Sequence, residues 1–245
     1  MEVIKKLDEQ QVKDFDTDYI EGKDWTDLSA YLSALFPEGA FCFLDIGGGN
    51  GVFCDKVLAA FPQASAVLLD NSEYLVALNE IRENKTIVCD SVENVTALFQ
   101  DKKFDVIFLN LVLHHFVGNS YQATYQNVVN TLNNLKPLLS ENGVVYIMED
   151  IYNGLIFDSL PSFLIFTLTS SKKMAKITKR LGANTAGTGV CFRSEKQWKR
   201  IIDKCGYEII REGDSHRFRF PLLKTLLLHL GKVGMKFLWL KKNRL

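Results

Sequence analysis

Residues 43–51 read Phe-Leu-Asp-Ile-Gly-Gly-Gly-Asn-Gly, an apolar run that enters a glycine-rich turn and carries an acid, Asp45, two residues before the first glycine. Such a run predicts a buried strand followed by a sharp turn. Gly47, Gly49 and Gly51 let the backbone turn and approach a ligand closely, because a Cβ atom there would clash or forbid a positive φ. The stretch therefore predicts the strand–turn–helix unit of an α/β fold that binds a nucleotide-like cofactor.

The spacing of the glycines distinguishes between cofactors. A dinucleotide fingerprint needs glycine or alanine three positions after its second glycine, and counting from Gly49 that position holds Val52, which disfavours NAD. The pattern Asp-x-Gly-x-Gly-x-Gly instead resembles motif I of the class I S-adenosylmethionine (SAM) methyltransferases. Taken alone, the motif leaves open an ordinary strand–helix turn with structural glycines.

Acids also end the next two predicted strands. Residues 66–69 precede Asp70, Asn71 and Ser72, and residues 86–89 precede Asp90 and Ser91. Asp70 follows Gly51 by 19 residues, close to the spacing of about 20 that places an acid on the hydroxyls of a ribose. In the family, the acid at the position of Asp90 accepts a hydrogen bond from the exocyclic amine of adenine, so the resemblance implies this role for Asp90. Helix N-capping is the alternative role for each acid.

The resemblance continues along the chain. Strand four is expected at 104–109, and the family's strand-four loop, which ends in a histidine pair beside the methionine moiety and the substrate, matches residues 110–116. Strand five is expected at 143–148 and ends in Glu149 and Asp150. The likeness resumes at Ser194, before a predicted helix over 195–206 and a strand over 207–210.

The resemblance implies SAM as cofactor and S-adenosylhomocysteine (SAH) as product. The implied cofactor contacts come from the glycine turn and the strand ends: Asp45, Gly47, Gly48, Gly49, Gly51, Asp70, Asn71, Asp90, Ser91 and Asn110. Methyl transfer needs a nucleophile in line with the methyl group and, for hydroxyl or carbon acids, removal of a proton. His114 and His115 are the candidate bases, one of which we expect to be structural, and Glu149 is a second candidate base or an orienter of the acceptor. No metal site is expected.

The segment after strand four narrows the choice of acceptor. Family members that methylate base amines or glutamine amides carry Pro-Pro and an aromatic residue after Asn or Asp, whereas Asn110 is followed by Leu-Val-Leu, and no cysteine follows a proline as cytosine C5 chemistry requires. O-, C- or N-methylation of a small, partly apolar acceptor is left. Two alternatives stay open, an RNA- or acidic-carrier-associated methyltransferase and a non-catalytic SAM-fold partner subunit.

The 245 residues predict one domain, a doubly wound, seven-stranded, mostly parallel sheet of the Rossmann-like methyltransferase type. Additions expected on this core are an N-terminal helical cap (1–40), a helical lid insertion (151–193) and a C-terminal helix (222–245). Tyr19 and Trp25 lie in the cap, which in the family often closes over SAM. The aromatic content of the insertion indicates an apolar acceptor or, equally, packing in a homodimer.

The net charge of zero conceals a separation of charge. Residues 1–170 hold 10 Lys/Arg against 24 Asp/Glu, and residues 171–245 hold 19 against 5. Such asymmetry points to an anionic partner for the basic part (a carrier protein, a membrane surface or RNA) or to a basic tail that packs on its own chain. Five scattered cysteines and a charged N-terminus predict a reducing, cytoplasmic location.

Overall fold

The computed structural model describes residues 3–13 and 20–243. The chain divides into two compact units: an N-terminal unit of Asp8–Asn110 and Asn134–Val145, and a C-terminal unit of Met1–Leu7, Leu111–Asn133 and Tyr146–Leu245. Seven strands form one sheet in the order β3-β2-β1-β4-β5-β7-β6. The expectation of a seven-stranded, mostly parallel sheet is confirmed.

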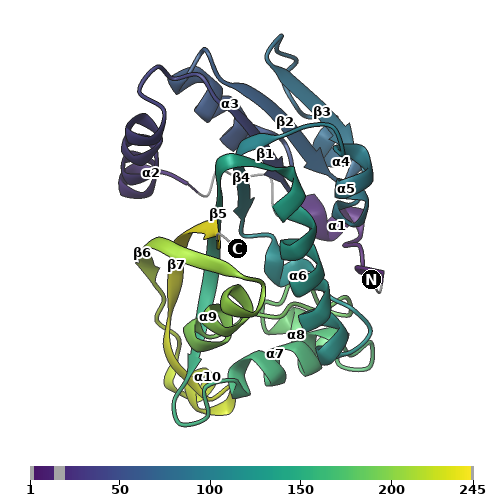
Figure 1. The fold of residues 1–245 in the computed structure, drawn as a ribbon. Helices are drawn as coiled ribbons and strands as arrows, with labels where there is room; N and C mark the ends of the chain where they lie inside the picture. Colours follow the sequence, from purple (N-terminus) through teal and green to yellow (C-terminus); the bar gives the residue numbers. More distant parts are fainter. Residues whose placement is uncertain (1–2, 14–19, 244–245) are drawn as a thin grey trace. The chain divides into compact units, whose positions relative to one another are not determined.

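The N-terminal unit contains the parallel strands β1 (Cys42–Ile46), β2 (Ser65–Asp70), β3 (Lys85–Cys89) and β4 (Phe104–Asn110) (Figure 1). β1 pairs with β2 on one side and with β4 on the other, and β2 pairs with β3. The helices of this unit are α1 (Glu9–Val12), α2 (Gly22–Leu35), α3 (Val52–Ala60), α4 (Glu73–Val76) and α5 (Val95–Leu98), the last preceded by a 3-10 turn (Val92–Asn94). This parallel order brings the carboxyl ends of β1 and β2 to the same edge.

Local sequence explains where these helices begin. Gly51, with a φ of 80°, stands at the N-cap of α3, and the Ser72 side chain accepts from the Leu75 N–H at the start of α4. The core beneath them is aromatic, since the ring of Phe108 lies 5.5 Å from that of Phe43 and 5.0 Å from that of Phe53, both edge to face. The buried strand and its glycine turn are thus held on a rigid base.

The C-terminal unit is built on the later part of β5 (Leu139–Gly154) and the antiparallel pair β6 (Tyr207–Arg217) and β7 (Leu230–Lys242) (Figure 1). Both β5 and α6 (Tyr121–Leu135), which a 3-10 turn (Lys136–Leu138) follows, contribute to both units. The other helices are α7 (Leu160–Ser170), α8 (Ala175–Arg180), α9 (Glu195–Lys204) and α10 (Leu222–Leu227). A capping box between Ser194 and Gln197 starts α9.

The expected C-terminal helix over 222–245 is wrong beyond residue 227. The chain leaves α10 and forms β7, which pairs with β6 through Arg211↔Trp239 and Gly213↔Phe237. Glycine explains the difference: a Cβ on Gly231 would lie 2.8 Å from the Gly154 carbonyl oxygen, so the backbones approach closely there. Glycine also weakens a helix, while the aromatic residues of this segment favour a strand.

The two other expected additions are partly visible. Residues 151–193 contain the end of β5 together with α7 and α8, so the insertion is helical as expected, and its role as a lid stays a prediction. The described part of the N-terminal cap holds α1 and α2, with Trp25 on α2. Tyr19 lies outside the described residues.

Candidate functional site

The glycine turn of the N-terminal unit adopts the backbone conformation expected of it. Gly47, Gly49 and Gly51 have φ angles of 71°, 54° and 80°, a region that favours glycine. Asp70, at the end of β2, supports the turn, since one carboxylate oxygen accepts from the Gly49 N–H at 3.0 Å and the other from the Ser72 N–H at 2.8 Å. Each oxygen keeps a further lone pair with which Asp70 could accept from a ligand.

Two residues that support the turn were not predicted from the sequence. The Asn79 side-chain amide donates to the Gly49 carbonyl at 2.8 Å, and Lys85 pairs with Asp55 at 2.8 Å. A Cβ on Gly51 would strike the Asn79 side chain and lie 3.1 Å from the Lys85 ammonium. The sequence signals only one of these two residues, because Lys85 is a charged residue at the start of an apolar strand.

Asp45 is a buried acid beside the turn. Burial, and next the charge of Asp70, raise its pKa to about 7, and Lys85 acts in the opposite direction. Its Oδ2 atom has no hydrogen-bond partner among the residues that the structure describes. A buried carboxylate oxygen in this state is ready to accept from a ligand.

The other predicted cofactor residues of this unit differ in whether their polar atoms already have partners within the protein. Asn110, at the end of β4, has both side-chain amide atoms buried without a partner within residues 3–13 and 20–243. Asp90 instead accepts from the Ser91 N–H at 2.6 Å and from Asn94 at 2.8 Å, while the Ser91 hydroxyl caps the following turn. Asn71 is exposed. Local capping therefore engages Asp90 and Ser91, and Asn110 is the more available partner for a ligand.

The C-terminal unit brings all three candidate catalytic residues together. His114 Nδ1 lies 2.6 Å from one oxygen of Glu149, whose other oxygen accepts from the Leu113 N–H at 2.7 Å. The rings of His114 and His115 are 4.2 Å apart. Both histidines belong to a 3-10 turn (Leu113–His115), just after Leu111, whose φ of 51° is rare for a side chain of this kind.

The two histidines have opposite protonation preferences. Burial opposes the charge on His114, but attraction and hydrogen bonding to Glu149, with a smaller contribution from Asp150, outweigh it and raise the pKa of His114. Burial and then the positive His114 lower the pKa of His115 well below its usual value. His114 therefore favours the charged form beside Glu149, and His115 favours the neutral imidazole.

A row of rings extends from this pair. Phe192 lies 4.9 Å from the His114 ring and stacks on Tyr152 at 4.4 Å with an interplanar angle of 9°. Tyr152 is followed by Phe220 at 6.1 Å. These three aromatic side chains are only partly buried, and Phe192 gives the His114 ring an apolar neighbour.

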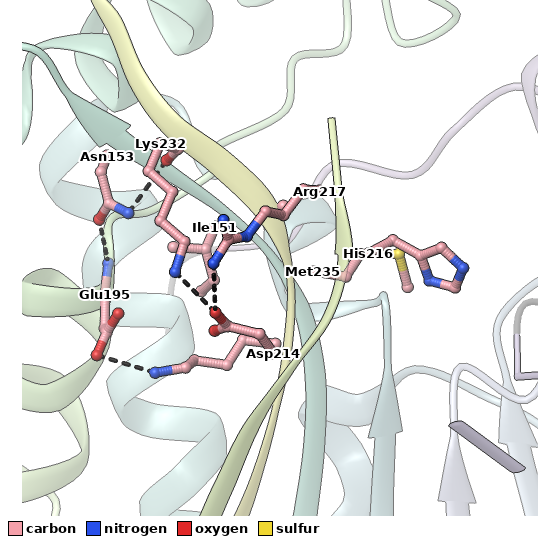
Figure 2. A pocket seen from close by; sticks show the side chains of 10 residues that line it. Ile151, Asn153, Glu195, Asp214, His216, Arg217, Lys232 and Met235 are labelled. Carbon is pink, nitrogen blue, oxygen red and sulfur yellow. Dashed lines mark hydrogen bonds and ion pairs between the residues drawn. The ribbon is translucent and has the colours of Figure 1, made fainter. Parts of the chain in front are cut away.

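A small pocket lies elsewhere on the C-terminal unit (Figure 2). It is lined by charged side chains that pair with one another: Glu195 with Lys236 at 2.9 Å, and Asp214 with Lys232 at 2.7 Å. None of the candidate catalytic residues lines it. Because its carboxylates are already engaged, the pocket adds nothing to the candidate site.

The residues of the glycine turn fit a SAM-like group. The Asp70 carboxylate can accept from the hydroxyls of a ribose, and Asp45 Oδ2 can accept from a cationic amino group. A Cβ on Gly48 would lie 2.6 Å from Asp45 Oδ2, so glycine at this position keeps that oxygen accessible. Asn110 offers both a donor and an acceptor. The buried atoms without partners at Asp45 and Asn110 are what a polar ligand would satisfy.

Comparison with known proteins agrees with this arrangement. A family model described as a methyltransferase domain matches residues 44–145. The malonyl-[acyl-carrier protein] O-methyltransferase of Bacillus anthracis is 25% identical over 203 residues, which cover 78% of this chain and 64% of that protein. The chain spans the same 64% of the corresponding Bacillus cereus protein.

Solved structures agree on the fold. The plantazolicin methyltransferase BpumL in complex with a triazolic desmethylPZN analog and SAH has a TM-score of 0.60 and 17% identity, over 95% of this chain and 88% of that one. A putative methyltransferase from Bacillus halodurans has a TM-score of 0.60 and 13% identity, over 89% of this chain and 100% of that one. The family model thus assigns residues 44–145 to a methyltransferase domain, and the solved structures show that the chain has the fold of methyltransferases crystallised with SAH.

Proposed function

We propose that this chain binds SAM and transfers its methyl group to a small or carrier-borne acceptor with an apolar part, leaving SAH. The observation that carries the proposal is the glycine turn held by Asp70, with the unpartnered Oδ2 of Asp45 beside it. SAM supplies an electrophilic methyl carbon on a sulfonium. The acceptor's electron pair forms the new bond to that carbon, and the pair of the carbon–sulfur bond goes to sulfur.

The protein's own contribution is to position the acceptor and to take up a proton where there is one to remove. His115 is the base, because it is the neutral histidine of the pair, and its ring nitrogen accepts the proton of a hydroxyl or carbon acid. His114 and Glu149 are positioning residues that hold the turn carrying His115. The ring row of Phe192 and Tyr152 supports an acceptor with a flat or apolar part.

Of these two kinds of acceptor, the charge distribution favours the carrier-borne one. Residues 171–245 have 19 basic and 5 acidic side chains, which would complement an acidic carrier protein, and the Bacillus relatives are named for such a substrate. If the acceptor there is a carboxylate, no proton needs to be removed. RNA, the other alternative, would bind the same basic side chains through its phosphate groups.

The direct test is binding and turnover. Calorimetry with SAM and SAH checks the cofactor, and mass spectrometry of incubations with hydroxyl, amine and acyl-carrier substrates searches for a gain of one methylene unit. Absence of binding to both SAM and SAH would contradict the proposal. If the methyl group is transferred only to RNA, the protein is the RNA methyltransferase of the alternative hypothesis.

Replacing Asp70 with Ala is expected to weaken SAM binding by about 1.5–3 kcal/mol, the contribution of a hydrogen bond to a charged group. The variant removes the acceptor for the ribose and for the Gly49 N–H together. Glu73→Ala is the matched control, because it removes an acid from the start of α4 without touching the turn. Equal SAM affinity of the two variants in calorimetry would refute the role of Asp70.

SAM affinity is expected to fall as the pH drops below about 7. Asp45 is raised to a pKa of about 7 in the free protein, so lower pH protonates it, and a cationic group beside Oδ2 requires the carboxylate. Well below that pKa the affinity should drop about tenfold per pH unit, with one proton released on binding. Titrations from about pH 5.5 to about pH 8 measure the slope. Asp45→Asn should flatten it, and an unchanged slope in that variant would assign the effect to another group.

A further inference from the structure

An apolar surface lies on the C-terminal unit, away from the histidine pair in sequence. It consists of seven large side chains that are 51–80% exposed: Leu155, Ile156, Phe157, Leu222, Leu223, Leu226 and Leu227. We call it the α10 patch. Single exposed leucines are ordinary on a protein surface, but seven from two short segments form the kind of patch that marks an interaction site.

Hydrogen bonds join the two segments into one surface. The Ile156 and Phe157 N–H groups donate to Nε2 of His229 at 2.9 and 3.0 Å, and the Leu155 N–H donates to the His229 carbonyl at 3.0 Å. His229 lies two residues after the end of α10, and in Figure 1 α10 lies beside the loop that follows β5. The loop 155–157 and α10 therefore present their side chains together.

The helix turns one face outward and is anchored by its flanks. At 100° per residue, the four leucines of α10 occupy about 140° of the helix, and Lys224 lies outside that arc. Phe220 and Leu228, on either side of α10, pack against the buried cluster of Ile165, Val190, Leu230 and Val233. The leucines are thus exposed on a helix whose ends are fixed in the core.

The charges around the α10 patch are positive. Residues 215–235 contain Arg217, Arg219, Lys224 and Lys232 and no acid. Arg217 and Lys232 lie in the pocket of Figure 2, where both pair with Asp214, at 3.8 and 2.7 Å, so the basic side chains that border the patch are Arg219, before α10, and Lys224, on it. The acid next to the loop, Asp158, is engaged by the Ser194 hydroxyl. An apolar face bordered by basic side chains matches the chemistry of an anionic lipid surface.

We propose that the α10 patch docks this protein on the surface of an anionic membrane, with the leucines in the headgroup region and the basic side chains on the lipid phosphates. The docking is peripheral, since within residues 3–13 and 20–243 no helix is long and apolar enough to cross a bilayer. A second copy of the chain fits this surface less well. A two-fold interface would set the basic border of one copy, Arg219 and Lys224, against the same border of the other, and like charges oppose association.

The experiment is sedimentation of the full chain with vesicles of equal parts phosphatidylglycerol and phosphatidylcholine, compared with vesicles of phosphatidylcholine alone. We expect the chain to sediment with the anionic vesicles and binding to weaken as salt is added. The double variant Leu223→Ser with Leu227→Ser should lower the binding constant about tenfold or more. Ile81→Ser is the matched control, because Ile81 is 95% exposed on the N-terminal unit, and its binding should equal that of the wild type.

Three results would overturn the proposal. One is failure of the wild-type chain to bind anionic vesicles, and another is equal binding of the double variant and the wild type. The third is a wild-type dimer in light scattering that the double variant dissociates without any vesicle binding, which would make the surface a contact between two copies. Because the substituted leucines are exposed, an unchanged melting temperature checks that the variants are folded, and Lys224→Glu tests the charge separately with an expected loss on anionic vesicles only.

Discussion

Turnover of the His115→Ala variant is expected to be about a hundredfold to ten-thousandfold lower than that of the wild type on a hydroxyl or carbon-acid acceptor, which is the usual contribution of a general base. SAM affinity should stay within a few-fold, because His115 acts on the acceptor. His115 can act as a base because burial, and next the positive charge that His114 favours beside Glu149, lower its pKa and favour the neutral imidazole. Single-turnover rates with SAM in excess measure the effect.

The pH profile separates a base from a structural residue. Since the pKa of His115 is lowered, the wild-type rate should persist below the ordinary imidazole pKa of about 6.5 and fall only at more acidic pH. His216→Ala is the control, an exposed histidine on β6 whose loss should leave rate and profile unchanged. Full turnover in His115→Ala would mean that the acceptor is already nucleophilic, as a carboxylate is, and that positioning alone carries the reaction.

Much of the cofactor half of the fold is predictable from the sequence because its signals are local. The apolar run 43–46, the glycines after it and the acid at 70 each lie within one strand and its turn, and parallel pairing then places β1 and β2 side by side. The prediction of a helix over residues 222–245 is wrong for a related reason. Its strand character depends on pairing with β6, while its leucines and lysines are compatible with a helix, and the glycines at 231 and 234 are the signal that would have corrected it.

The roles within the catalytic group are not predictable in the same way. His114 and His115 are adjacent and chemically identical in the sequence, and only the contact with Glu149, 35 residues away, makes one charged and the other neutral. Likewise, Asn79 reaches the Gly49 carbonyl from 30 residues away. Long-range side-chain contacts decide these assignments, and no spacing rule reports them.

The largest expected loss of stability belongs to Glu149→Ala, about 3–5 kcal/mol in the free energy of unfolding, the range for breaking a buried ion pair. Glu149 is 1% exposed, and its removal leaves His114 Nδ1 and the Leu113 N–H without their acceptors. Glu149→Gln should lose less, because the amide oxygen still accepts from Leu113 and the amide nitrogen can donate to a neutral His114. Urea unfolding measures both, and equal losses would show that charge, rather than hydrogen bonding, sets the cost.

The same pair of variants gives a signature that depends on pH. His114 has a raised pKa in the folded protein, so its stabilising contribution is present below its ordinary value of about 6.5 and is lost as the pH rises through the raised value. The stability difference between the wild type and Glu149→Gln should therefore shrink as the pH rises. In Glu149→Gln the positive charge beside His115 is also removed, which raises the pKa of His115 and moves the acid limb of the rate profile to higher pH. If the limb stays in place in Glu149→Gln, His115 does not sense His114, and the division of roles between the two histidines is wrong.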